Sequence, residues 1–327
     1  MPKIIFILFF LGCLTTPQAY SLEVRCFDQK KQIQAEVFDS NVRYPESPLF
    51  EGGALYFVEY ARSQVIRFKG KEKTVFWKSQ GCGPAAISAL ENGEFLVSCY
   101  DRNSIVKLSK TGEQVQEFSS DHLGFPFRGP NDFTHHPEFG IYFTASGEFH
   151  PQAPVEGKIL HLSNDGFKTV ATGIHYANGL AISDQGRSLL VSEHLKNRIL
   201  RYEIKPGGLL SDRPSVFADL SVLGPIAVDF SQGLLGPDGL RVDDDGRVYV
   251  AHYGGAQVLK LSPSGELIGI ISISATYPNI TNLWIHGSTL YLSAVQDSSR
   301  PGDAGLLFSI HDPHLASRKN LVCQILE

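Results

Sequence analysis

The chain has 327 residues, of which 43% are hydrophobic and 19% are charged, and its formal net charge is −5. This composition is typical of a globular protein and excludes a largely disordered one, and the absence of a Lys/Arg-rich block argues against a nucleic-acid partner. The 31 glycines and 18 prolines favour many turns and short strands over a helix bundle.

The first 21 residues predict a signal peptide. Lys3 precedes the apolar run 4–14, which is followed by the small-x-small stretch Ala19-Tyr20-Ser21. The run is shorter than the roughly 20 residues that a membrane span needs, and no later stretch qualifies. We expect cleavage after Ser21 and a single mature domain, residues 22–327, in the periplasm or outside the cell. A lipid anchor on Cys13 is the alternative, although the residues before Cys13 match a lipoprotein signal poorly.

The two ends of the expected domain, residues 22–28 and 321–325, are both predicted strands, so they can pair in one blade with Cys26 facing Cys323. Cys82 precedes a predicted strand and Cys99 ends the next one, which places them at the same end of antiparallel neighbours. Four of the five cysteines follow residue 21, and an even count in an exported chain indicates disulfides. We expect the pairs Cys26–Cys323 and Cys82–Cys99, with four buried free thiols as the alternative.

A short alternating segment recurs along the chain and predicts a repeated β-strand. A second strand follows each copy, turn signals separate the copies, and further strands such as 74–78 and 214–218 close most units. The repeat predicts an all-β fold, a six-bladed β-propeller of four-stranded antiparallel blades, whereas an irregular β-sandwich would not explain the six-fold period. The recurring segments are 54–60, 94–100, 140–146, 188–194, 247–253 and 289–295, and the strands that follow them are 64–68, 104–108, 158–162, 198–202, 257–261 and 305–310.

Polar side chains recur at the start of the innermost strand of each repeat. The aligned column reads Glu46, Ala85, Asn131, Asn178, Asp238 and Asn282. In a propeller this column forms a ring at one mouth of the central channel. Carboxylates with neutral amides suit Ca²⁺, which takes about six to eight oxygen ligands, and no Cys/His set has zinc spacing. We predict a divalent cation, with Mg²⁺, Mn²⁺ and Zn²⁺ as alternatives to Ca²⁺, although each Asn-Gly or Asp-Gly pair could simply form a turn.

Six short motifs occur in order between residues 43 and 321. They are Glu46-Ser-Pro-Leu-Phe, Pro130-Asn-Asp, Ala177-Asn-Gly-Leu-Ala-Ile-Ser, Arg198-Ile-Leu-Arg-Tyr, Gly236-Pro-Asp-Gly-Leu and Val250-Ala-His-Tyr-Gly-Gly. Together they resemble the SMP-30/gluconolactonase family and, more distantly, the paraoxonase and diisopropyl-fluorophosphatase propellers. The resemblance implies a six-bladed propeller with a divalent metal, often Ca²⁺, and hydrolysis of lactones in many members.

The resemblance also assigns roles to individual residues. It implies metal ligands at Glu46, Asn178 and Asp238, and a metal or substrate contact at Asn131. Two departures stand out. Ser47 occupies a position where the family often has glycine, and Arg128 lies one residue further from Asn131 than the family's arginine, which weakens the case that Arg128 contacts a sugar lactone.

A bound cation could polarise a carbonyl oxygen and lower the pKa of a water, and Asp238 could then act as a general base on an ester carbonyl. A phosphoryl oxygen would suit the same site. No Gly-x-Ser-x-Gly elbow, P-loop or dinucleotide fingerprint competes. His194 and His252 end equivalent strands at the same face and are candidate substrate contacts or proton shuttles, although hydrogen-bonded rim histidines are the simpler interpretation.

We therefore expect an exported, metal-dependent hydrolase of lactones or related esters. Three segments are expected to overhang the metal face as partly hydrophobic lids: the insertions 148–157 and 296–303 and the apolar linker 220–235. Such lids favour a bulky apolar lactone or ester over a free sugar. A non-catalytic, cation-binding propeller is the main alternative, and a propeller with other chemistry, such as a strictosidine-synthase-like one, is a third.

Overall fold

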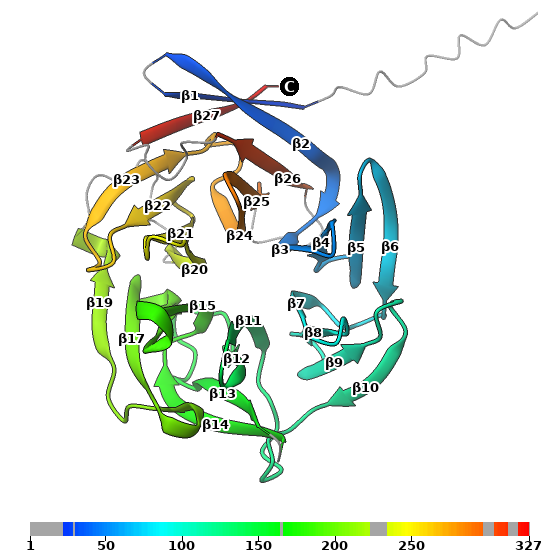
Figure 1. Cartoon of the computed structure of the whole chain (residues 1–327), viewed down its shortest axis with the longest axis vertical. Helices are drawn as coiled ribbons and strands as arrows, with labels where there is room; N and C mark the ends of the chain where they lie inside the picture. The colour runs from blue at the N-terminus through cyan, green and yellow to red at the C-terminus, as the bar shows by residue number, and fades with distance from the viewer. Residues whose placement is uncertain are drawn as a thin grey trace, which may run out of the picture.

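The computed structural model places the strands of the chain in sheets arranged as a ring (Figure 1). It describes residues 22–28, 30–163, 166–222, 234–296, 304–312 and 320–326. The expected signal peptide with Cys13, the insertion 296–303 beyond its first residue, and most of the linker 220–235 lie outside these ranges.

Four of the sheets are separate and antiparallel. The first contains β3 (Pro45–Glu51), β4 (Ala54–Glu59), β5 (Gln64–Lys69) and β6 (Glu72–Lys78). The second contains β7 (Pro84–Ala89), β8 (Phe95–Cys99), β9 (Ser104–Leu108) and β10 (Gln114–Phe118). The third contains β11 (Pro130–His136), β12 (Gly140–Ala145), β13 (Gly157–Ser163) and β14 (Gly166–Ile174). The fourth contains β15 (Ala177–Ser183), β16 (Ser188–Glu193) and β17 (Arg198–Lys205), and both β18 (Leu209–Leu210) and β19 (Ser215–Asp219) pair with β17.

The other strands form one continuous sheet of ten strands with two antiparallel arms. One arm contains β20 (Gly236–Val242), β21 (Val248–Tyr253), β22 (Gln257–Leu261) and β23 (Leu267–Ser272). The other contains β24 (Asn279–His286), β25 (Thr289–Val295), β26 (Ala304–His311) and β2 (Lys31–Arg43). Between the arms, β27 (Asn320–Leu326) pairs in parallel with β23 and antiparallel with β1 (Glu23–Asp28), which pairs with β2.

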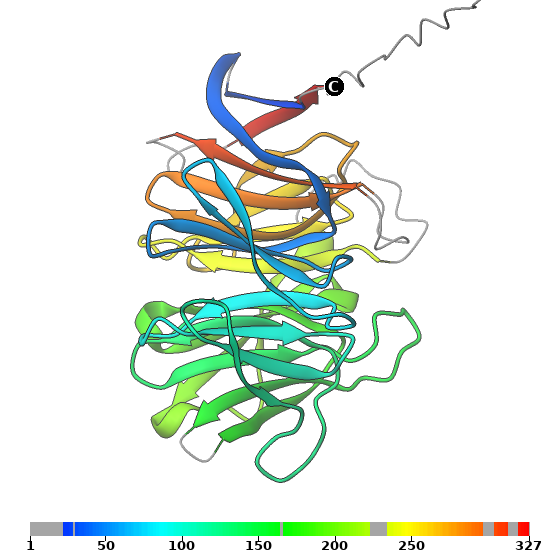
Figure 2. The same ribbon diagram turned by 90° about the vertical axis from the view of Figure 1, so that its right-hand side faces the viewer.

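The strands β1 and β27 form a terminal clasp at the rim of the ring (Figure 2). Cys26 lies opposite Cys323 in their ladder, and the two are joined by a disulfide; a second disulfide joins Cys82 to Cys99. These are the pairs expected from the sequence. The two terminal strands pair as expected, but they do not lie in one blade: the 13-residue β2 already pairs with β26, so β1 and β27 bridge two arms of the sheet.

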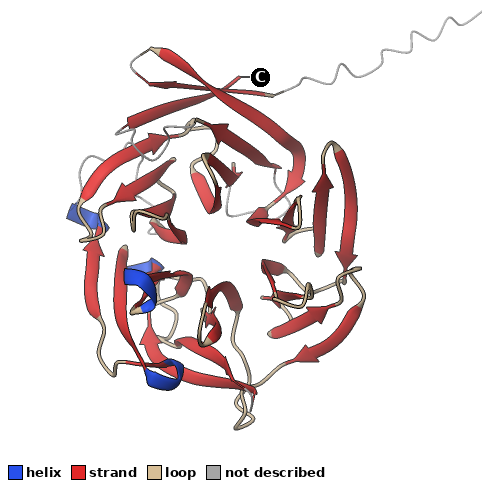
Figure 3. Ribbon diagram, viewed as in Figure 1, coloured by secondary structure: helices blue, strands red, loops and turns tan. Residues whose placement is uncertain are grey.

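The predicted all-β fold with four-stranded antiparallel sheets is confirmed (Figure 3). The recurring first strands correspond to β4, β8, β12, β16, β21 and β25, and the second strands to β5, β9, β13, β17, β22 and β26. Helical structure in the described ranges is limited to single 3-10 turns, and no helix there is long and apolar enough to cross a membrane.

Hydrophobic clusters fill the spaces between neighbouring sheets. Val58 of β4 packs with Val97 of β8, and Phe57 of β4 packs on the other side with Tyr291 of β25. Because both faces of these strands are covered, β4, β8 and β16 are buried along their whole length. The innermost strands contact one another in the closed order β3, β7, β11, β15, β20, β24 and back to β3. This order brings residues that are distant in sequence around one axis.

Candidate active site

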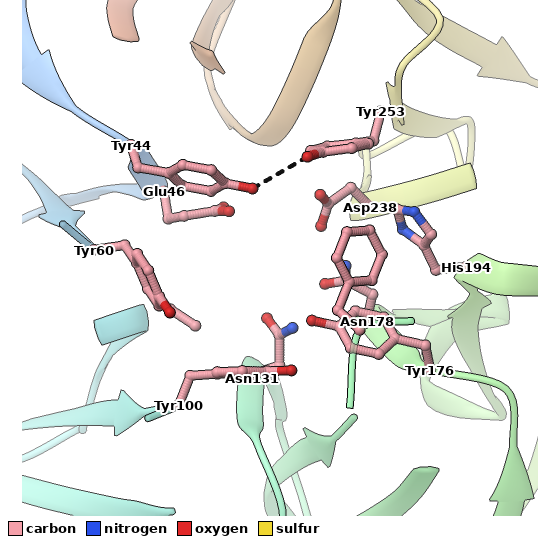
Figure 4. A pocket seen from close by; sticks show the side chains of 12 residues that line it. Tyr44, Glu46, Tyr60, Tyr100, Asn131, Tyr176, Asn178, His194, Asp238 and Tyr253 are labelled. Atoms are coloured by element: carbon pink, nitrogen blue, oxygen red, sulfur yellow. Dashed lines mark hydrogen bonds between the residues drawn. The ribbon is translucent and has the colours of Figure 1, made fainter. Parts of the chain in front are cut away.

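A pocket of about 150 Å³ lies where the innermost strands converge (Figure 4). Four side chains that the sequence singled out line it together: Glu46 on β3, Asn131 on β11, Asn178 on β15 and Asp238 on β20. Ala85 on β7 also lines it. The predicted convergence of the ring positions is therefore present for these five residues.

A β-bulge lies at each of these ring positions. The pairing of the innermost strand with its neighbour shifts register between Glu46 and Leu49, and again at the equivalent places in β7, β11, β15, β20 and β24. A bulge leaves one residue outside the regular ladder and bends the strand, so it can redirect a side chain. The bulges explain how residues at the ends of strands point into the channel.

Buried hydroxyl groups fasten the bulges to the preceding sheet. Ser98 Oγ donates to the Asn131 carbonyl at 2.5 Å, Thr144 Oγ1 to the Asn178 carbonyl at 2.7 Å, and Ser192 Oγ to the Asp238 carbonyl at 2.7 Å. All three hydroxyl residues are fully buried. Each of these three ring positions is thus held by the second strand of the sheet before it, which limits how far its side chain can move.

Asn282 does not occupy the ring position that the sequence alignment gave it. In β24 the register shift falls between Ile280 and Asn282, so Thr281 takes the ring position, and its hydroxyl donates to the Pro45 carbonyl at 2.8 Å. The Nδ2 of Asn282 instead donates to Asp132 Oδ2 at 3.4 Å. The sixth position therefore carries a hydroxyl in place of an amide.

The carboxylates of Glu46 and Asp238 point toward one another across the pocket (Figure 4). Desolvation raises the pKa of both well above the usual range, and the charge of Asp238 raises the pKa of Glu46 further. The nearby Asp132 charge acts in the same direction on both groups, whereas hydrogen bonds from Thr281 and Asn178 oppose the shift. No lysine or arginine is among the described residues that line the pocket. A divalent cation would relieve this repulsion.

The donor atoms fit a hard cation. Asn131 Nδ2 donates to Ser146 Oγ at 3.1 Å, which leaves its Oδ1 available to the pocket. No group of three or more His, Cys, Asp and Glu side chains in the described ranges could hold a metal ion. The set here consists instead of two carboxylates with amide oxygens, the ligand type that Ca²⁺ takes.

Asp132 lies behind the ring and has its own cationic partner. Its Oδ2 is 3.3 Å from Arg241 Nη1, and its Oδ1 accepts a hydrogen bond from the Phe133 amide at 2.8 Å. The Arg241 guanidinium also lies over the Trp284 ring at 5.2 Å. This buried carboxylate is therefore paired within the protein and is not a candidate ligand in the pocket.

The structure separates the two histidines that the sequence paired. His194 lines the pocket and is buried, which lowers its pKa to about 4. His252 does not line the pocket, and burial lowers its pKa to about 3. Its Nε2 lies 3.0 Å from Asn197 Oδ1 and its Nδ1 lies 3.1 Å from Gln257 Nε2. His252 is thus better described as a hydrogen-bonded structural histidine than as a substrate contact.

Arg128 is exposed and does not line the pocket either. The extra residue between Arg128 and Asn131 fits this placement. Of the expected lids, 148–157 is fully described, and its Phe149 does line the pocket.

Aromatic residues that were not predicted from the sequence complete the pocket wall. Two signals could have revealed them. The recurring first strands run into Tyr60, Tyr100, His194 and Tyr253, and a tyrosine stands two residues before the ring position in two repeats. The aromatic lining residues are Tyr44, Tyr60, Tyr100, Phe149, Tyr176 and Tyr253.

Known proteins resemble this chain in both sequence and fold. The model of the SMP-30/Gluconolactonase/LRE-like region matches residues 44–296. The lactonase drp35 of Staphylococcus epidermidis is 28% identical over 229 residues, which cover 67% of this chain and 66% of that protein, just under two thirds of its length. A calcium-binding regucalcin from Agrobacterium tumefaciens has a TM-score of 0.68 at 19% identity, covering 85% of this chain and 93% of that one. A gluconolactonase from Xanthomonas campestris has a TM-score of 0.68 at 16% identity, covering 88% and 94%. At these identities the solved structures support a common fold and no more.

Proposed function

This chain belongs to the SMP-30/gluconolactonase/LRE-like family, and we propose that it is a metal-dependent hydrolase of lactones or related esters. The observation that carries the proposal is the pair of facing carboxylates, Glu46 and Asp238, in a pocket that holds amide oxygens and no lysine or arginine among its described lining residues. The name of the curated relative, a lactonase, supports the same reaction class.

We propose that Glu46, Asn178 and Asp238, together with Asn131, hold the divalent cation. The oxygen donors favour Ca²⁺, and Mg²⁺, Mn²⁺ and Zn²⁺ are the alternatives. A structurally similar protein that is described as calcium-binding supports this choice. When bound, such a cation supplies Lewis-acid polarisation of a carbonyl oxygen and lowers the pKa of a water.

Asp238 is the proposed general base. The hydrogen bond from Ser192 to its backbone carbonyl holds this residue in place, and the Asn178 side chain hydrogen-bonds its carboxylate. Asp238 would accept a proton from the attacking water as the new C–O bond forms, and would return a proton to the leaving oxygen as the ester bond breaks. His194 stays neutral near pH 7 because its pKa is about 4, so it contributes an uncharged wall next to this step.

We also propose that the ring has six blades within a single domain, residues 22–327. The closed order of the innermost strands and the hydrophobic clusters between neighbouring sheets support this count. Two disulfides favour an oxidising compartment, which supports export by a signal peptide at residues 1–21.

The test is lactone and ester hydrolysis across a panel, with and without a chelator, for the wild type and Asp238→Asn. We expect turnover that the chelator abolishes and that Ca²⁺ restores, and a loss of at least a hundredfold in Asp238→Asn, the scale that a general base contributes. Asp121→Asn is the matched control, because Asp121 is a buried carboxylate that does not line the pocket, and the variant should keep chelator-sensitive turnover. A folded, cation-binding protein that hydrolyses nothing in the panel would favour the non-catalytic module, for which the ligand-free ring position at Ala85 leaves room.

A further inference from the structure

Six aromatic rings form a closed collar around the mouth of the pocket (Figure 4). Consecutive ring centroids lie 5.5, 6.5, 6.5, 5.8 and 5.5 Å apart, and the hydroxyls of the first and last members, 3.2 Å apart, close the circle. We call this set the aromatic collar. Its members, in order, are Tyr44, Tyr60, Tyr100, Tyr176, His194 and Tyr253.

The backbone of the ring makes room for the collar. Tyr60 and Tyr100 follow β4 and β8, and in each case the next sheet presents a glycine. A Cβ on Gly83 would lie 3.0 Å from Tyr60 Cε2, and a Cβ on Gly129 would lie 2.7 Å from Tyr100 Cε2. Any other residue at Gly129 would push the tyrosine ring out of place.

Two collar tyrosines are held in a conformation that favours glycine. Tyr44 and Tyr176 have φ values of 51° and 60°, and each stands two residues before a ring position. The residues two positions before the ring in β7 and β11 are Gly83 and Gly129, with φ values of 54° and 56°. A bulky side chain at positive φ is strained, and such strain is concentrated at functional sites. The side chains of Tyr44 and Tyr176 therefore have a functional role that a glycine at either position could not fill.

One phenyl ring of the chain already lies against the collar. Phe149, between the exposed residues Glu148 and His150, is half-buried. Its ring centroid is 4.7 Å from Tyr176, and it meets His194 and Tyr253 edge-to-face at 5.1 and 6.0 Å. Such geometry is favourable between aromatic rings. The pocket volume of about 150 Å³ is similar to that of an engineered apolar cavity that binds benzene, so beside a cation it has room for no more than one ring.

The collar offers few free polar groups. Tyr60 donates to Asp101 Oδ1 at 2.6 Å, Tyr100 donates to the Gly147 carbonyl at 2.8 Å, and the hydroxyls of Tyr44 and Tyr253 bond each other. A sugar hydroxyl that faces the collar would have to break one of these bonds or stay without a partner, and unpaired polar groups in a desolvated site are costly. An apolar ring meets no such cost.

Building on the proposed function, we infer that the aromatic collar determines specificity and that the substrate is a lactone or ester bearing a flat apolar ring, not a polyhydroxylated sugar lactone. Tyr44 and Tyr176 contact that ring from opposite sides of the pocket (Figure 4). The contacts of Phe149 with Tyr176, His194 and Tyr253 show that the collar accepts a phenyl ring.

Binding of two lactams tests the inference separately from turnover. The probes are 3,4-dihydroquinolin-2-one and D-glucono-1,5-lactam, which share a six-membered cyclic amide but carry either a fused benzene ring or hydroxyls. Calorimetric titration of the Ca²⁺-loaded full chain should show the aryl lactam binding at least tenfold more tightly. Tyr44→Gly and Tyr176→Gly should each weaken the aryl lactam about three- to tenfold, the scale of one aromatic contact, and leave the sugar lactam unchanged. Tyr176→Phe keeps the ring and should keep the preference.

Equal affinity for the two lactams, or an undiminished preference in both glycine variants, would overturn the inference. Lactone turnover is measured in parallel on the same preparations. Turnover without a binding preference contradicts the role of the collar alone. A binding preference without turnover supports the collar and contradicts the proposed hydrolase function.

Discussion

The disulfide of the terminal clasp should stabilise the fold more than the internal disulfide does. Cys26–Cys323 joins the two ends of the described chain and closes the ring through β1 and β27, whereas Cys82–Cys99 joins neighbouring strands of one sheet. The perturbation is a pair of double variants, Cys26→Ala with Cys323→Ala and Cys82→Ala with Cys99→Ala. All four cysteines are buried, so the cost of burying the new alanines is closely matched.

The sequence separations set the expected magnitudes. They are 297 residues for the clasp and 17 for the internal pair. In the chain-entropy treatment, a disulfide removes freedom from the unfolded chain in proportion to the logarithm of the loop length. This gives about 6 kcal/mol for the clasp and about 3 kcal/mol for the internal pair. The clasp variant should therefore lose about 2.5 kcal/mol more of the free energy of unfolding.

The assay is urea unfolding of the oxidised wild type and of both double variants under the same conditions. A lower midpoint for the clasp variant than for the internal variant is expected. Equal losses, or a larger loss for the internal variant, would show that the clasp disulfide does not stabilise the fold by restricting the unfolded chain.

Three further changes probe the site. Because Tyr44 has a φ of 51°, the Tyr44→Gly variant should be more stable than Tyr44→Ala by about 1 kcal/mol in thermal unfolding. At Tyr100, which has no positive φ, the alanine variant should be the more stable one. The same order at both positions would argue against strain at Tyr44. Burial lowers the pKa of His252 to about 3, so the unfolded chain binds a proton that the folded chain does not. The contribution of His252 to stability is therefore complete above about pH 6.5 and falls below it by up to about 1.4 kcal/mol per pH unit. His252→Gln should reduce the slope of stability between pH 6.5 and 4, to which His194 also contributes, and an unchanged slope would contradict this assignment. Ser192→Ala removes the hydroxyl that donates to the Asp238 carbonyl, so it should lower the free energy of unfolding in urea by about 1–3 kcal/mol and weaken Ca²⁺ binding. An unchanged Ca²⁺ affinity would show that this hydrogen bond does not position Asp238.

The repeat and the main ring residues were accessible from the sequence because both recur at a fixed place in each unit. Glu46, Asn131, Asn178 and Asp238 fall into one column as soon as the repeats are aligned. The column failed in the last repeat, where Thr281 and not Asn282 lines up with the others. A β-bulge shifts register by one residue, and nothing in the local composition of β24 marks where the extra residue falls.

The clasp and the collar depend on information that the sequence pattern does not carry. Pairing of β1 with β27 could be inferred from the cysteines, but their role as a bridge depends on the length of β2, which no repeat unit predicted. The collar draws its rings from two different places, the ends of strands for Tyr60 and Tyr100 and the positions before the innermost strands for Tyr44 and Tyr176. Only the closed ring brings these two sources into one circle.

The proposed cation site is tested most directly by a crystal structure of the full chain grown with Ca²⁺. We predict one strong density peak within about 2.3–2.6 Å of the side-chain oxygens of Glu46, Asn178 and Asp238, which disappears in crystals of Asp238→Asn. A Ca²⁺ ion that binds elsewhere in the molecule, or these side-chain oxygens lying too far apart to share one ion, would contradict it.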